Sequence, residues 1–164
     1  MIETPDEYNQ DYVKFFCQRN GLHRYDNFDD KKNTLCDQRI SIIISELQQW
    51  PCYEIQDHKK VDHPIHKLSF LAELGFNIDD PGIKKIVERV IAHQSGEGPF
   101  NILINIPKRF GGSSEAQLSW VMSDAPLVVY SVTKLNKTIN ERIEKAIDSI
   151  AEGVSSNGWR CFAS

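Results

Sequence analysis

One apolar pattern recurs along the chain and limits what it can fold into. In each copy, apolar residues stand at positions i, i+3, i+4 and i+7, which places four side chains on one face of an α-helix. The copies are Ile40, Ile43, Ile44 and Leu47; Ile83, Ile86, Val87 and Val90; and Ile143, Ala146, Ile147 and Ile150. The sequence therefore predicts three amphipathic helices, each with its apolar face buried and its opposite face in solvent.

A more uniformly apolar segment precedes each of the last two copies. Pro64–Leu74 is followed by Gly75, and Ala125–Leu135 is followed by Asn136; glycine and asparagine are the residues that most often end a helix. A helix that is apolar on most sides is buried on several sides. With Tyr12–Phe16 as the inner member of a degenerate first pair, we expect about three helix pairs, each with an inner and an outer helix.

Glycine-containing turns with a following aromatic residue end the last two pairs. Gly98 precedes Phe100, and Gly158 precedes Trp159; the two glycines lie 60 residues apart, as do Ile83 and Ile143. We therefore expect both aromatic side chains to occupy equivalent positions and to pack onto the preceding helix pair.

The segment between these two pairs does not follow the helical pattern. Asn101–Pro107 is rich in isoleucine and is bounded by proline and glycine, which predicts a short strand or an extended loop. Ser113–Trp120 is expected to begin another helix.

The length of 164 residues is typical of one domain. We expect an all-α fold, a single helical-repeat domain over residues 1–164. Residues 1–62 would form the degenerate first pair and its connectors, residues 63–100 the second pair, and residues 101–164 an insert loop with the third pair.

The order of these features resembles the α/α-toroid superfamily of terpenoid cyclases and protein prenyltransferases, most closely its cyclase-like or prenyltransferase-like proteins of undefined activity. The resemblance covers residues 64–163 best and includes the segment Trp120–Pro126 (WVMSDAP) ahead of an inner helix. It implies a helical barrel whose inner helices surround an aromatic-lined cavity for an isoprenoid chain. Such a barrel closes with more helix pairs than are found here. The chain is therefore expected to be an incomplete barrel: a half-barrel, a self-associating protein or a fragment that lacks C-terminal repeats.

Asp124 is the catalytic candidate that this resemblance implies. The acidic motif of the protonating cyclases corresponds to residues 122–124, where Asp124 is the one acid. At the mouth of an apolar cavity, burial would raise the pKa of this carboxyl and suit it to donate a proton. The alternative is an N-cap for the helix that begins at Ala125. The cysteine neighbourhood of the zinc-binding prenyltransferases is not present after Asp124, so we predict no metal and no cofactor.

Two further groups are candidates for ligand binding. Trp120 and Tyr130 would form an aromatic wall whose faces attract a carbocation, or they are plain core residues. Lys108 and Arg109, followed by two glycines, would hold a phosphate or diphosphate through charge and backbone N–H groups. The alternative for this basic segment is a turn ahead of the next element, since it lacks the residue order of a P-loop.

Histidines supply the last candidate site. His58, Asp62, His63 and His66 form a metal-like cluster, and the i, i+3 spacing of His63 and His66 directs both toward one side of a helix start. We keep His63 and His66 as candidate ligand-binding residues but predict no metal there, because no strict zinc motif is present. The four cysteines are far apart and form no C-x-x-C pair.

Charge and hydropathy exclude several classes of protein. Lys and Arg number 19 and Asp and Glu 23, a net charge of −4, which opposes non-specific nucleic-acid binding. No apolar run approaches the roughly 18 residues of a membrane span, and the acidic start is unlike a signal peptide, so we expect a cytoplasmic protein.

The leading function is a prenyltransferase- or terpene-cyclase-like domain that binds an apolar ligand of the isoprenoid class, with catalysis itself left open. The alternative is a non-catalytic helical-repeat scaffold for protein partners.

Overall fold

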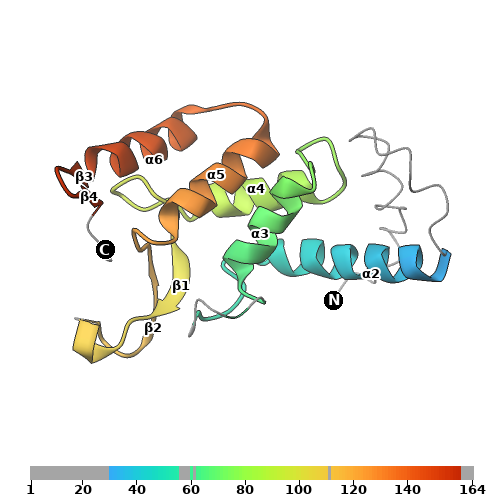
Figure 1. Cartoon of the computed structure of the whole chain (residues 1–164), viewed down its shortest axis with the longest axis horizontal. Helices are drawn as coiled ribbons and strands as arrows, with labels where there is room; N and C mark the ends of the chain where they lie inside the picture. Colours follow the sequence, from blue (N-terminus) through green and yellow to red (C-terminus); the bar gives the residue numbers. More distant parts are fainter. Residues whose placement is uncertain (1–29, 56–59, 61, 111, 160–164) are drawn as a thin grey trace.

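The computed structural model of the chain describes residues 30–55, 60, 62–110 and 112–159, apart from the side chains of 30–36 and 110. The helices in this part are α2 (Asp30–Leu47), α3 (Pro64–Glu73), α4 (Ile83–Ala92), α5 (Ala125–Asn136) and α6 (Glu141–Glu152), with a short 3₁₀ helix, η3 (Lys108–Phe110) (Figure 1). The strands are β1 (Ile102–Asn105), β2 (Ala116–Ser119), β3 (Val154–Ser155) and β4 (Gly158–Trp159). The predicted inner helix at Tyr12–Phe16 lies outside the described residues.

The expected all-α fold is wrong, because the chain is mixed α/β. β1 pairs antiparallel with β2, from Ile102 opposite Ser119 to Asn105 opposite Ala116, and β3 pairs antiparallel with β4. The predicted strand at 101–107 is confirmed as β1, but the helix predicted at 113–120 is the strand β2. The cause is tertiary: β1 places Ile102 and Ile104 in the core, and the backbone N–H and C=O groups of such a strand need partners, which residues 116–119 supply by pairing with it.

The helices that follow residue 63 lie where the apolar spacing predicts them. α3 begins at Pro64 and ends at Glu73, and α5 begins at Ala125 and ends at Asn136, each end within one residue of the predicted one. Proline in the first turn removes no helical hydrogen bond, because the N–H groups there have no partner within the helix. Gly75, with φ of 82°, follows the end of α3.

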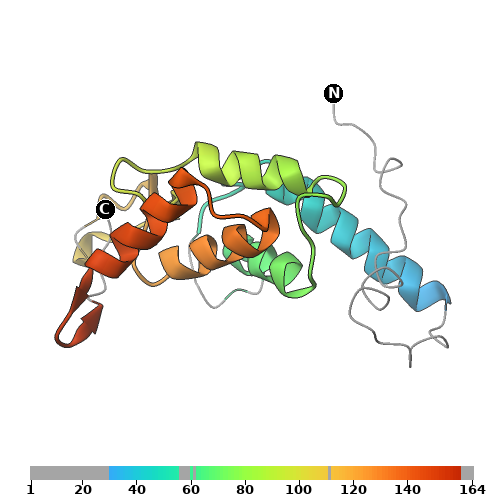
Figure 2. The ribbon, with the colours of Figure 1, turned by 90° about the horizontal axis from the view of Figure 1, so that it is seen from above.

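α5 is the central helix of the described part. It packs against α3, α4 and α6, whereas α2 packs against α3 and α4. Figure 2 shows α3 and α5 side by side, with α4 and α6 across them. All five helices and β1 contribute to one apolar core, whose fully enclosed members include Ile44, Leu47, Leu68, Leu71, Ile86, Val90, Val132, Leu135 and Ile143.

The apolar faces of the outer helices are covered to different extents. Ile86, Val87 and Val90 on α4 are buried, as predicted. Ile150 on α6 is half-buried, and Ile147 is 37% exposed, so the predicted burial of Ile147 is wrong. Within the described residues, α6 packs mainly against α5, which leaves part of its apolar stripe uncovered. Ile43 on α2 is also only half-buried.

The two glycine–aromatic turns are not equivalent. Phe100 is 1% exposed and belongs to the core, whereas Trp159 is 56% exposed on β4. Trp159 contacts the preceding helix through its indole, which donates to the carbonyl of Ile150 at 2.7 Å, but its side chain stays largely exposed, so the expectation of equivalent, packed positions is wrong. Among the residues that the structure describes, each helix is too short or too polar to span a lipid bilayer.

Candidate functional site

An open apolar groove runs between α5 and α6. Its volume is about 390 Å³, and it is lined by Pro126, Val129, Tyr130, Thr133 and Lys134 of α5 and by Ile147 and Ile150 of α6. The α5 residues recur at helical spacing and therefore share one face. Tyr130 is 46% exposed and Ile147 37%, so each of the two helices presents one large, partly exposed side chain to the groove.

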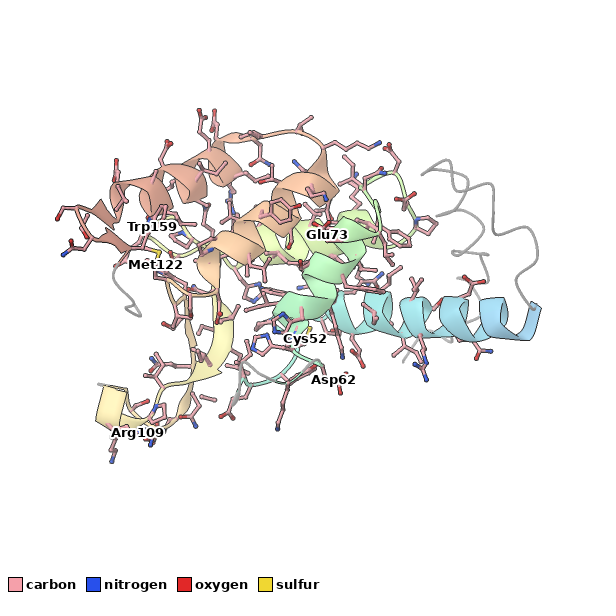
Figure 3. All side chains as sticks on the ribbon, in the orientation of Figure 1. Cys52, Asp62, Glu73, Arg109, Met122 and Trp159 are labelled. Carbon is pink, nitrogen blue, oxygen red and sulfur yellow. The ribbon has the colours of Figure 1, made fainter. Side chains whose placement is uncertain are left out.

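A charged contact between α3 and α5 borders this groove. The Tyr130 hydroxyl donates to Glu73 Oε1 at 2.6 Å, and Lys134 Nζ lies 3.1 Å from the same oxygen. Lys134 Nζ also lies 5.3 Å from the centre of the Tyr130 ring. The hydrogen bond from Tyr130, together with Lys134, lowers the pKa of Glu73, and contacts with Tyr130 and Glu73 raise the pKa of Lys134. Figure 3 labels Glu73 on the α3 side of this contact.

Trp120 is a core residue and forms no wall with Tyr130. Its side chain is 3% exposed and packs with Met122 and Ala125. Its indole Nε1 donates to Glu97 Oε2 at 2.9 Å. The core alternative for Trp120 is thus the correct one, while Tyr130 lines the groove.

Asp124 occupies the N-cap position of α5 but makes no capping hydrogen bond with its side chain. Its φ and ψ of −107° and −31° are helical, whereas a capping residue has extended backbone that turns its side chain toward the first N–H groups. Asn140, ahead of α6, has ψ of 169°, and its Oδ1 accepts from the N–H groups of Arg142 and Ile143. The predicted cap at Asp124 is therefore right in position and wrong in its bonding.

The histidines do not form a metal site in the described residues. His63 is 4% exposed and caps α3, where its Nδ1 accepts from the N–H of Ile65 at 3.4 Å. His66 is exposed, with its ring centre 5.3 Å from that of His63. No group of three or more His, Cys, Asp or Glu side chains in this part of the chain could hold a metal ion. His58 lies outside the described residues.

The basic segment lies far along the β1–β2 hairpin. Lys108 and Arg109 are exposed on η3, and Figure 3 shows Arg109 at the end of the hairpin, away from α5 and α6. A Cβ on Gly112 would lie 2.0 Å from the carbonyl oxygen of Ile106, so this glycine permits a close backbone approach. The N–H of Lys108 bonds Ser114 Oγ at 3.0 Å. These contacts support the turn alternative.

A polar cluster beneath α3 was not predicted from the sequence, because its members come from separate segments. Lys67 Nζ lies 2.6 Å from Glu46 Oε2 and 3.3 Å from the Tyr53 hydroxyl, and the Cys52 thiol donates to the carbonyl of Glu46 at 3.1 Å. Burial, followed by the charge of Glu46, raises the pKa of Cys52 to about 12. The thiol therefore stays protonated and is a poor nucleophile.

Sequence reasoning does not identify most of the groove residues. It names Tyr130 as an aromatic candidate but predicts Ile147 and Ile150 as core residues, because their stripe matches that of α4. The sequence signal that could identify the groove is the helical spacing of Pro126, Val129 and Thr133, which places them on one face of α5.

A second hollow of about 330 Å³ beside α6 is mainly acidic, lined by Glu97, Glu141, Glu144, Lys145, Asp148, Ser149 and Glu152.

No protein-family model matches the chain, and no curated protein or solved structure matches it. The likeness to the α/α-toroid enzymes therefore has no support beyond the sequence features.

Proposed function

We propose that this chain is a protein-interaction module whose binding surface is the groove between α5 and α6. One observation carries the proposal: Tyr130 and Ile147 are 46% and 37% exposed in a groove whose other members are mostly apolar. Contiguous exposed apolar surface is unfavourable in water and marks sites where another molecule binds.

The groups that catalysis would need do not converge on this groove. Asp124 is not among its lining residues, and Lys108 and Arg109 lie on the distant hairpin. A general acid has to reach the atom that it protonates within hydrogen-bond distance. The protonated Cys52 thiol beneath α3 offers no nucleophile. These placements favour the scaffold alternative over the enzyme.

An isoprenoid chain is the competing occupant, because the Tyr130 ring and the isoleucines offer it apolar contacts. Small-molecule sites usually enclose about 70–90% of their ligand. The α5–α6 groove is open to solvent, and an open apolar surface suits a protein partner better than a small ligand that needs enclosure.

The test selects binders from a random peptide library on the full chain and measures their affinity for two variants. Ile147→Glu places a charge in the groove, and Ile139→Glu is its matched control, since Ile139 is 60% exposed and does not line the groove. We expect selected peptides to lose about ten-fold or more in affinity, at least 1.4 kcal/mol, with Ile147→Glu and to keep their affinity with Ile139→Glu. If farnesyl diphosphate instead binds in an Ile147-dependent manner and no peptide does, the interaction-module proposal is wrong.

A further inference from the structure

Strand β2 forms a free edge of its sheet. β1 lies between β2 and Ile55: the N–H of Ile55 donates to the carbonyl of Leu103 at 2.8 Å, and the N–H of Asn105 donates to the carbonyl of Ile55 at 3.4 Å. Successive residues of a strand direct their backbone groups to opposite sides. Leu103 and Asn105 therefore face Ile55, and the alternate residues of β1 face β2.

The same alternation identifies the groups of β2 that point away from β1. Gln117 and Ser119 lie opposite the β1 residues that face β2, and their N–H and C=O groups bond β1. Ala116 and Leu118 direct their N–H and C=O groups to the other side. Within the described residues, no hydrogen bond to these groups is found. Such an edge is a template on which another strand can pair.

The features that usually protect an edge strand are not present on β2. Charged side chains, proline and β-bulges are common protections, but Ala116–Ser119 reads AQLS and pairs with β1 without a bulge. Leu118 is 54% exposed. The hairpin extends away from the helices (Figure 1), and a two-stranded sheet gains stability when further strands join it.

We propose that β2 pairs antiparallel with β2 of a second copy of this chain, about a two-fold axis that passes through Gln117. Two two-stranded sheets then become one sheet of four strands. In this register Ala116 of each copy lies opposite Leu118 of the other, and each such pair exchanges two hydrogen bonds. All the outward N–H and C=O groups of both strands are thereby satisfied. The edge of β2 is separate from the α5–α6 groove, so each surface can be tested without the other.

The side chains of β2 are compatible with this register. Gln117 is exposed and meets Gln117 of the second copy, and an amide side chain both donates and accepts hydrogen bonds. On the other face, Leu118 packs beside Ala116 of the second copy. A register centred on Leu118 would instead pair Ala116 with Trp120, which is 3% exposed and belongs to the core.

Charge favours the antiparallel orientation. Lys108 and Arg109 are exposed at the end of the hairpin (Figure 3), whereas the whole chain has a net charge of −4. A parallel pair would place the two basic ends side by side, where they repel. An antiparallel pair directs each basic end toward the acidic body of the other copy. Such a small interface is typical of a weak association, so we expect a dimer that forms as concentration rises.

The experiment measures self-association of the full chain by sedimentation from about 10 µM to about 1 mM, a range suited to a small interface. Gln117→Lys and Gln117→Glu each place like charges opposite one another across the axis, so each alone should weaken the dimer about three-fold or more. A mixture of the two variants, one of them fluorescently labelled, should form a heterodimer at least as tight as the native dimer, because the opposed charges attract. Gln49→Lys and Gln49→Glu are matched controls. Gln49 is exposed in the turn after α2, and its variants should dimerise as the native chain does.

A backbone variant tests the hydrogen bonds across the axis. Leu118→Pro removes an N–H that points away from β1, a position where an edge strand tolerates proline. The dimer should weaken about ten-fold or more, because each copy loses one donor to the other. Circular dichroism and urea unfolding check that every variant keeps the fold of the native chain.

Several outcomes would overturn the proposal. A chain that stays monomeric up to about 1 mM has no such interface. A mixture of the Gln117 variants that associates no better than either alone would show that the axis does not pass through Gln117. A dimer that Ile147→Glu removes would place the contact in the α5–α6 groove. An unrelated extended peptide that binds the monomeric chain, and that Leu118→Pro releases, would assign the edge to a different partner.

Discussion

The outer helices α4 and α6 carry the same apolar stripe and meet different surroundings. Val87 and Val90 on α4 are 3% and 0% exposed, whereas their counterparts Ile147 and Ile150 on α6 are 37% exposed and half-buried. α4 packs against both α5 and α2, and α6 packs mainly against α5. The stripe thus determines which face of a helix is apolar, and the neighbouring elements determine how much of it is removed from water.

The largest expected effect comes from truncating isoleucine on each helix. Ile86 on α4 is 0% exposed, so Ile86→Ala should lower the free energy of unfolding by about 2–5 kcal/mol through lost burial and a residual cavity. Ile147→Ala on α6 should cost less than about 1 kcal/mol, because much of that side chain is already in solvent. Urea denaturation with a shared slope measures both values.

An equal loss of unfolding free energy in Ile86→Ala and Ile147→Ala would contradict the difference in burial between α4 and α6. A cost above about 2 kcal/mol for Ile147→Ala would mean that this position is covered in solution. In that case the groove would not be an open surface, and the function proposed for it would fail.

The turns that follow the two helices allow a second, smaller test. A Cβ on Gly98 would lie 2.8 Å from the carbonyl oxygen of Lys145 and 2.9 Å from the Cβ of Ser149, whereas one on Gly158 meets nothing within 4 Å. Both residues have positive φ, 127° and 88°. Gly98→Ala should therefore destabilise the fold by about 1–3 kcal/mol through the clash, in addition to its backbone strain. Gly158→Ala should cost about 1 kcal/mol from strain alone.

Thermal or urea unfolding of both glycine variants separates the steric clash, expected only at Gly98, from the backbone strain expected at both positions. If Gly158→Ala is as destabilising as Gly98→Ala, the β3–β4 hairpin is packed against another part of the chain in solution.

The helices could be predicted from the sequence because their signal is local. The apolar spacing and an early proline place the starts of α3 and α5, and Gly75 and Asn136 place their ends within one residue. Strand β2 could not be predicted in this way. Residues 116–119 are extended because they pair with β1, a contact between segments that no local pattern contains.

The candidate site was predictable only in part for the same reason. Residue type suggested a cap at Asp124, but its helical ψ of −31° prevents one, while the extended ψ of 169° at Asn140 permits it. Tyr130 was recognised as a ligand-binding candidate from its ring. Ile147 could not be, because its stripe is indistinguishable from a buried one until the neighbouring elements are known.

The smallest expected effect concerns the contact that joins the two helix pairs. Hydrogen bonds from Tyr130 and Lys134 lower the pKa of Glu73 below its ordinary value of 4.5. A carboxyl with a lowered folded-state pKa stabilises the fold above its ordinary pKa, and this contribution is lost as pH falls through the folded-state value. Glu73→Gln should therefore be less stable than the native chain at pH 6, and the difference should shrink as the pH falls below about 4.5. The contact lies on the surface, so 1 M salt should also reduce the difference. Urea midpoints of both proteins from pH 3 to pH 7 measure it. A difference that persists unchanged to pH 3 would show that the Glu73 charge does not join α3 to α5, and that the rim of the groove is held by packing alone.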